Sequence, residues 1–371
     1  MSRAVELSAR SVLRICRLVG AALVERATQA CFVVLHPARG LLHEVPEVTP
    51  ARLRSGIAHG ARFLERAQRA DGSLRGFFLY PGASSSWLTA HVCFVLEGVS
   101  ELEGLMRRAA HYLARHGAED GGWGYNRHVA VDCDSTAQAL MVLQRFALPY
   151  PSFLIHDLAA AQAAGGGYPT YVPPTADAPR DGWQTVHAEV SAMVLECLRR
   201  AGGFDARVTR CTAWLAEVCD TGVLRSYWWS DPAYALWLQA RVGLLSAQAA
   251  PALQALLASG CACPQLPMAL SAALRLDDHE FDCALATRRI LAAQLADGSW
   301  PCAPCLRVTD NRVFDASPEA AGLVAADKRR VFATAHAVAA LHAMSARCFT
   351  RAAQTPAMLF QQATRITSPL T

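Results

Sequence analysis

Two kinds of apolar segment alternate along the chain. Six are apolar nearly all round and open with a polar or capping residue: 86–99, 134–146, 186–198, 231–243, 267–276 and 332–344. Six others carry apolar residues at helical spacing with Arg or Glu on the opposite face: 51–68, 101–117, 151–162, 205–219, 246–260 and 282–294. Helices that are apolar all round are buried, whereas amphipathic helices pack one face on a core. The pattern predicts an all-α protein, a closed α6/α6 barrel of six inner helices alternating with six outer ones.

Glycine-rich turns follow four of the outer segments. Their sequences are QRADGSL (68–74), GAEDGGWGY (117–125), QLADGSW (294–300) and the weaker AQAAGGGYPTY (161–171). Glycine readily takes the left-handed conformation that ends a helix. The Gln and Asp side chains of these turns can bond exposed backbone groups, and the Trp or Tyr can pack over the turn. The recurring turn supports a repeated architecture of helix pairs.

These turns carry a resemblance to a known superfamily. Residues 294–300 match the Q-x-x-D-G-S-W turn, and residues 68–74 match it with Leu74 in the last position. The chain therefore resembles the squalene cyclase and protein prenyltransferase β-subunit superfamily over about residues 50–345. The resemblance implies an α/α barrel with QW-type turns. Squalene cyclases and plant-type class II diterpene cyclases have two such domains, so a partner protein that supplies a second domain is one expectation.

The repeats divide the chain into three parts. Residues 51–345 are expected to form a single α/α barrel domain, residues 1–50 an N-terminal helical arm, and residues 346–371 a C-terminal tail with one short helix. The arm could cover a barrel end or make peripheral contact with a membrane. Charged residues such as Arg14 and Glu25 interrupt its apolar stretch, which is therefore neither a membrane span nor a cleavable signal peptide.

Composition narrows the class of function. The net charge of +4 comes from dispersed arginines, with Lys328 the only lysine, and this argues against a nucleic-acid partner. Thirteen cysteines in a chain without a signal peptide predict free thiols in the cytoplasm. No D-D-x-x-D motif is present, which argues against class I terpene chemistry. The acid-rich LDDHEFD (276–282) leaves Mg²⁺ binding as an alternative.

The start of the second inner segment, VDCDSTA, offers a candidate for catalysis. It resembles the D-x-D-D-T-A motif of class II terpene cyclases, with Ser135 in place of the last Asp. The resemblance implies that Asp134 is the general acid and Asp132 its partner. An alkene is a weak base, so the acid must be neutral, and a second carboxylate and apolar surroundings raise a pKa. The alternative is that Asp and Ser simply cap the helix.

The resemblance implies an enzyme, an isomerase or lyase of secondary metabolism that cyclises an isoprenoid or similar apolar polyene after protonation, with no cofactor. The alternative from the other branch of the superfamily is a zinc-dependent prenyltransferase that uses Asp132, Cys133 and His336. In that family the Asp and Cys are two residues apart, whereas here they are adjacent and point in different directions. A third alternative is a non-catalytic barrel that binds an isoprenoid or a partner segment.

Polar and aromatic residues open the other inner segments and are candidates for substrate binding. They are Trp87, His91, His187, Glu189, Tyr227, Trp228, Trp229, Asp231, Tyr234 and His336. Aromatic faces stabilise a carbocation because the ring quadrupole attracts positive charge without supplying a nucleophile. The alternative is that these rings fill contacts between helices. Two long segments, 170–183 and 301–330, precede inner helices and are expected to lie at one barrel end, where they could cover the cavity.

Overall fold

The computed structural model describes residues 47–117, 121–173, 181–220, 226–245, 247–259, 263–276, 281–314 and 322–366, with side chains up to Cys348. Within these residues lie twelve α-helices, α2 to α13, and the strands form two short hairpins. The all-α class is therefore confirmed. The described residues belong to one compact unit, Pro46–Thr371. The predicted N-terminal arm falls almost wholly outside them.

Six amphipathic helices form an outer set. They are α2 (Pro50–Ala67), α4 (Glu103–Arg115), α6 (Phe153–Ala160), α8 (Asp205–Asp220), α10 (Ala250–Ala258) and α12 (Cys283–Ala292). Each buries one stripe, as Leu53, Ile57 and Leu64 do in α2. Each contacts at least one inner helix. The predicted outer segments are thus helical in the structure.

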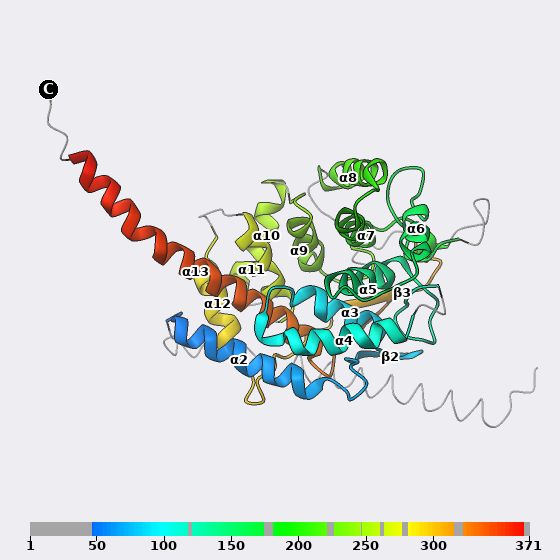
Figure 1. The fold of residues 1–371 in the computed structure, drawn as a ribbon, viewed down its shortest axis with the longest axis horizontal. Coiled ribbons are helices and arrows are strands. Elements are labelled where there is room, and N and C mark those ends of the chain that lie inside the picture. Colours follow the sequence, from blue (N-terminus) through cyan, green and yellow to red (C-terminus); the bar gives the residue numbers. More distant parts are fainter. Residues whose placement is uncertain are drawn as a thin grey trace, which may run out of the picture. The chain divides into compact units, whose positions relative to one another are not determined.

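Six further helices form an inner set. They are α3 (Ser86–Val95), α5 (Cys133–Arg145), α7 (Ala188–Ala201), α9 (Ala233–Arg241), α11 (Gln265–Leu276) and α13 (Val331–Ile366). Every residue of α3 is buried. Each inner helix contacts the next along the chain, and α13 contacts α3 (Figure 1). The six segments predicted as inner helices are therefore neighbours in a cyclic order.

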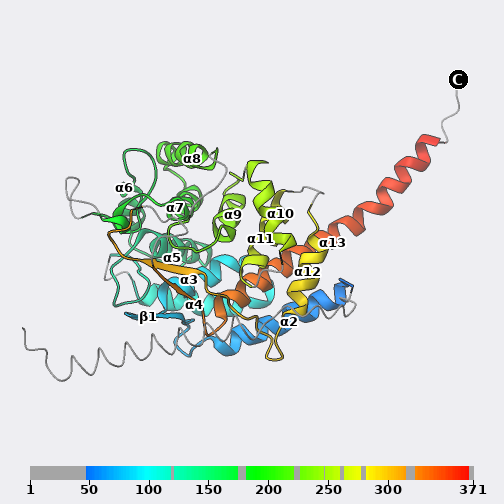
Figure 2. The same ribbon diagram turned by 180° about the vertical axis from the view of Figure 1, so that it is seen from behind.

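Helix α13 extends well past the sixth predicted inner segment. It continues to Ile366, through the region expected to be a C-terminal tail with one short helix (Figure 2). None of the described helices, α13 included, is both long enough and apolar enough to cross a membrane.

The glycine turns tie outer helices together. The Gln68 amide donates to the carbonyls of Gly72 and of Leu105 near the start of α4. Gln162 and Gln294 make the same pair of bonds, to the glycine four residues on and to another outer helix. Gly72 has φ +92°, and a Cβ there would collide with the Arg108 carbonyl oxygen. Glycine is required because neither the backbone angle nor the space admits a side chain.

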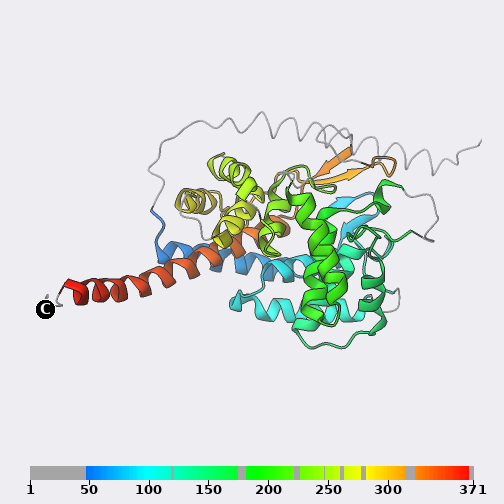
Figure 3. The ribbon, with the colours of Figure 1, turned by 90° about the horizontal axis from the view of Figure 1, so that it is seen from above.

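The segments that lead into the inner helices gather at one end. Strands β1 (Gly76–Leu79) and β2 (Gly82–Ser84) precede α3, and β3 (Leu306–Thr309) and β4 (Gly322–Ala325) precede α13. Strand β1 contacts β4, and the two hairpins lie close together in Figure 3. The Gly182 N–H donates to the Asn311 carbonyl. The described parts of the two long segments therefore meet, as predicted.

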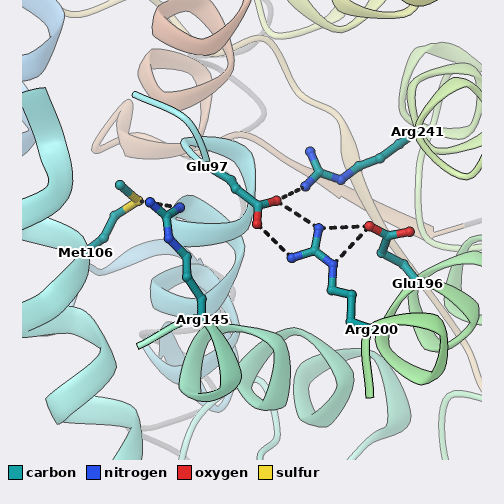
Figure 4. Close-up of polar contacts among 6 residues, drawn as sticks. All are labelled: Glu97, Met106, Arg145, Glu196, Arg200 and Arg241. Carbon is teal, nitrogen blue, oxygen red and sulfur yellow. Dashed lines mark hydrogen bonds and ion pairs between the residues drawn. The ribbon is translucent and has the colours of Figure 1, made fainter. Parts of the chain in front are cut away.

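An ion-pair network joins the C-terminal ends of three inner helices, α3, α7 and α9 (Figure 4). Glu97, just after α3, accepts two 2.8 Å hydrogen bonds from Arg200 of α7 and a 2.5 Å bond from Arg241 of α9. Arg200 also binds Glu196. The C-terminal end of a helix carries partial negative charge, so arginines are favoured there. The network ties together the inner-helix ends farthest from Asp134.

Candidate active site

Asp132 caps the N-terminus of α5. Its backbone is extended, and its Oδ1 accepts a 2.6 Å hydrogen bond from the Ser135 N–H. Its Oδ2 accepts a 2.8 Å bond from the Ser135 hydroxyl. The capping alternative therefore applies to Asp132. Ser135, which replaces the third acid of the resembled motif, serves as the partner of this cap.

Asp134 lies in the first turn of α5 and makes different contacts. Its Oδ2 accepts a 2.7 Å hydrogen bond from the Trp87 indole on α3 and a 3.0 Å bond from the Gln138 amide. Within the described residues its Oδ1 makes no hydrogen bond. The side chain is largely enclosed by protein yet keeps part of its surface exposed. The two oxygens of this carboxyl group therefore have different surroundings.

Both carboxyl groups are weaker acids than ordinary aspartates. Burial, together with the nearby charges of Asp132 and Glu189, raises the pKa of Asp134 to about 8, against the lowering effect of the hydrogen bonds from Trp87 and Gln138. Burial raises the pKa of Asp132 to about 7, while the bonds from Ser135 lower it. Asp134 therefore holds its proton near neutral pH, as a carboxyl must if it is to donate that proton.

Gln138 belongs to this site although the sequence patterns did not single it out. Its Nε2 donates to Asp134, and its Oε1 lies 2.8 Å from Nδ1 of His91. The side chain is fully buried. Gln138 lies four residues after Asp134, on the same helix face. That spacing is the signal that could have indicated it.

His91 and His336, predicted to bind substrate, contact each other between α3 and α13. Their Nε2 atoms are 3.0 Å apart, and their side chains are 0% and 1% exposed. Burial lowers the pKa of His91 to about 3 and that of His336 well below its ordinary value. Both imidazoles are therefore neutral.

A buried aromatic cluster surrounds Trp87 and His91. Its members are Phe77, Trp87, Trp229, Tyr234, Trp237 and Phe332. Trp229 stacks on Tyr234 with ring centroids 4.1 Å apart and on Phe332 at 5.2 Å. The faces of such rings stabilise positive charge. Phe77, Trp237 and Phe332 were not predicted, although Phe332 is the second residue of α13, as Trp87 is of α3.

Glu189 lies near Asp134, whereas His187 lies in a separate contact. Glu189 Oε1 accepts 2.8 Å hydrogen bonds from the Ser226 hydroxyl and the Trp228 N–H, and burial raises its pKa. The His187 ring stacks on Tyr227 at 4.1 Å. Burial lowers the pKa of His187 to about 4. Glu189 acts on Asp134 through its charge.

The remaining predicted residues pack around the start of α9. The Tyr227 hydroxyl donates to the Val313 carbonyl, and the Trp228 indole donates to the Thr170 hydroxyl. Asp231 accepts hydrogen bonds from the Ala233 N–H and the Gln265 amide. Each therefore holds a loop or a helix start. Of the fourth segment, the structure brings Trp229 and Tyr234 into the aromatic cluster beside Asp134.

The alternative zinc ligands are not brought together. His336 contacts His91, and Asp132 binds Ser135. Among the residues that the structure describes, no three His, Cys, Asp or Glu side chains could hold a metal ion together. Cys133 is buried, and burial raises the pKa of its thiol. In the acid-rich segment predicted as an alternative Mg²⁺ site, residues 277–280 lie outside the described part of the chain.

A groove of about 670 Å³ opens beside Asp132. Its lining includes Asp132, Cys133, Tyr171 and Trp183. Asp134 does not line this groove and instead contacts Trp87 of the aromatic cluster. The two acids therefore face different surroundings, although only Cys133 separates them in the sequence.

Solved structures identify the fold. No protein-family model and no curated protein matches the chain. The apo structure of the type II terpene cyclase MstE from Scytonema is 24% identical, with a TM-score of 0.63 over 80% of this chain and 99% of MstE. An MstE variant in complex with its substrate, geranylgeranyl dihydroxybenzoate, is 23% identical, with a TM-score of 0.62 over 80% and 98%. A protein from Actinoplanes is 26% identical, with a TM-score of 0.64 over 79% and 99%.

The chain therefore has the fold of the type II terpene cyclases. In its fold the chain thus agrees with the predicted resemblance to the terpene cyclase superfamily. The match spans nearly the whole of the MstE chain.

Proposed function

We propose that this protein is a type II terpene cyclase-like enzyme in which Asp134 protonates an isoprenoid substrate. One observation carries the proposal: Asp134 retains its proton near neutral pH, and its Oδ2 is held by Trp87 and Gln138 while Oδ1 is free. The aromatic cluster lies beside the same carboxyl group. A proton donor next to aromatic faces is the combination that initiation of a carbocation requires.

The reaction balances without a redox step. Oδ1 transfers its proton to an alkene carbon, and the resulting carboxylate is stabilised by the two hydrogen bonds on Oδ2 and by the N-terminus of α5. The neighbouring double bonds attack the cation and close rings, while the aromatic cluster stabilises the positive charge. Loss of a proton from the final cation gives a product isomeric with the substrate.

The proposal includes the architecture and the substrate class. The cyclic contacts among the six inner helices support a closed α6/α6 barrel. The complex of MstE with geranylgeranyl dihydroxybenzoate supports an isoprenoid, with or without an aromatic head group, as the substrate. Asp132 is held by the hydrogen bonds with which it caps α5 and does not take part in the proton transfer from Asp134 Oδ1. It acts as the charged neighbour that keeps Asp134 protonated.

Turnover by the purified full chain tests the proposal. Geranylgeranyl dihydroxybenzoate and a set of polyprenyl diphosphates would be incubated with the protein, and products of unchanged mass sought by mass spectrometry. Asp134→Asn should abolish turnover while tryptophan fluorescence still reports ligand binding. Asp282→Asn is the control for an Asp→Asn change at a helix start outside this site, because Asp282 caps α12 and Asn is an equally good cap.

Three results would overturn the proposal. Undiminished activity in Asp134→Asn would remove the general acid. About one zinc per freshly purified chain, lost in Cys133→Ser, would favour the transferase alternative. Tight isoprenoid binding without conversion of any substrate would instead indicate a binding barrel.

A further inference from the structure

A chain of buried side chains leads from α13 through α3 to the acid on α5. His336 Nε2 lies 3.0 Å from His91 Nε2, and His91 Nδ1 lies 2.8 Å from Gln138 Oε1. Gln138 Nε2 lies 3.0 Å from Asp134 Oδ2. His336, His91 and Gln138 are at most 1% exposed. A buried polar group is costly unless it is bonded, so this arrangement calls for an explanation.

The protons along this chain are set by its chemistry. The Gln138 amide donates to Asp134, so its carbonyl oxygen must accept from His91, which places a hydrogen on His91 Nδ1. A neutral His91 then has a lone pair on Nε2, and His336 must donate from its own Nε2. Every bond in the series therefore donates toward Asp134.

We propose that His91 and His336 are positioning residues that act through Gln138 and bind no substrate. They hold the Gln138 amide with its NH₂ toward Asp134, so that Oδ2 receives two hydrogen bonds and the proton remains on Oδ1. Aligned hydrogen bonds polarise one another and strengthen donation to the carboxylate that forms when the proton leaves. Without His91 the amide is free to rotate and present its carbonyl oxygen to the carboxyl, which would stabilise the protonated form instead.

Other ionisable groups lie around this series of hydrogen-bonded side chains and are present in every variant of His91 and His336. Asp132 and Glu189 raise the pKa of Asp134 through their charges, and Tyr234 is buried near both Asp134 and Glu189. Arg241 lowers the pKa of both imidazoles in addition to the effect of burial. None of these groups replaces the hydrogen bond that His91 makes to Gln138.

The test compares two substitutions at each histidine. His91→Phe keeps a ring but cannot donate, whereas the Nδ2–H of His91→Asn can replace the Nδ1 donor. At position 336, Phe removes the donor and Gln can replace Nε2–H. Infrared difference spectra against Asp134→Asn, recorded across pH on the full chain, report the protonation of the Asp134 carboxyl directly. His187→Asn is the control, because His187 is a buried imidazole outside this chain.

We expect His91→Phe to raise the pKa of Asp134 and to lower kcat about 10- to 100-fold with KM little changed. His91→Asn should bring the pKa of Asp134 and kcat most of the way back to their wild-type values. His336→Phe should likewise raise that pKa and lower kcat, and His336→Gln should restore much of both quantities. An unchanged or lowered Asp134 pKa in His91→Phe, or equal impairment in both His91 variants, would overturn the inference. If His91→Phe fails to fold, the His336 pair decides the question.

The catalytic part of this role rests on the proposed function, but the infrared titration does not require turnover. A shifted carboxyl pKa in a protein that converts no isoprenoid would sink the proposed function and leave the positioning role intact. Normal turnover with an unshifted pKa of Asp134 in both His91→Phe and His336→Phe would contradict the positioning role and leave the proposed function intact.

Discussion

The Trp87 indole donates a 2.7 Å hydrogen bond to Oδ2 of Asp134, and this bond connects α3 to α5 at the candidate acid. The two residues are 47 positions apart in the chain. The bond lowers the pKa of Asp134 against the larger effect of burial. Trp87 therefore makes the buried carboxyl a stronger acid than its surroundings alone would allow.

Trp87→Phe should raise the pKa of Asp134 and lower kcat by about tenfold or more, because a hydrogen bond to the developing carboxylate is lost. The pH–rate profile on a polyprenyl substrate measures both quantities. Trp229→Phe is the matched control for the pKa, since Trp229 belongs to the same aromatic cluster but does not bind Asp134. A pKa that moves equally in both variants would show that general repacking is responsible.

Asp132→Asn should shift the loss of activity to lower pH. In the wild type, activity should be present while Asp134 is protonated and fall as the pH rises through its pKa of about 8. The charge of Asp132 raises that pKa, so removing it lowers the pKa of Asp134. Asn is as good an N-cap as Asp, which should leave the stability of α5 unchanged. If the pH–rate profile shows activity falling at the same pH in Asp132→Asn as in the wild type, the two carboxyl groups do not interact.

Asp134→Asn should stabilise the fold at neutral pH. In the unfolded chain the carboxyl ionises near its ordinary pKa of 3.8, whereas in the folded protein it stays protonated to about 8. Between these values the unfolded state releases a proton that the folded state keeps, so rising pH favours unfolding of the wild type. The variant should therefore melt a few degrees higher at pH 7, with a gain that disappears below about pH 4. Calorimetry at several pH values measures this, and a gain independent of pH would contradict it.

Glu97→Gln should destabilise the protein by about 2 kcal/mol, because it leaves Arg200 and the largely buried Arg241 without their shared carboxylate. The arginine partners hold the pKa of Glu97 below its ordinary value against burial. This stabilisation is present above the ordinary pKa and is lost as the pH falls through the lowered one. Denaturant unfolding at pH 7 and at low pH tests the loss. Arg312→Gln breaks an exposed ion pair with Asp310 and should cost nothing measurable.

The helices and their inner or outer class could be predicted because helical periodicity is a local property of the sequence. The segments 86–99 and 51–68 differ in how apolar residues surround the helix, and the structure places them as α3 and α2 accordingly. The candidate acid could also be indicated, since Asp132 and Asp134 lie two positions apart in a short motif. The length of α13 could not, because Pro356, a residue type that ordinarily ends or kinks a helix, lies within it.

Only the tertiary structure decided which side chains meet. His91 and His336 are 245 residues apart, and their contact depends on α13 packing against α3 with one particular rotation and axial position. The packing of α3 against α5 likewise decides that Trp87 reaches Asp134 and that His91 reaches Gln138. The sequence by itself determined which faces are buried, because hydrophobic burial is non-directional. Hydrogen bonds are directional and short, so the partners of Asp134 were determined only once the inner helices had packed.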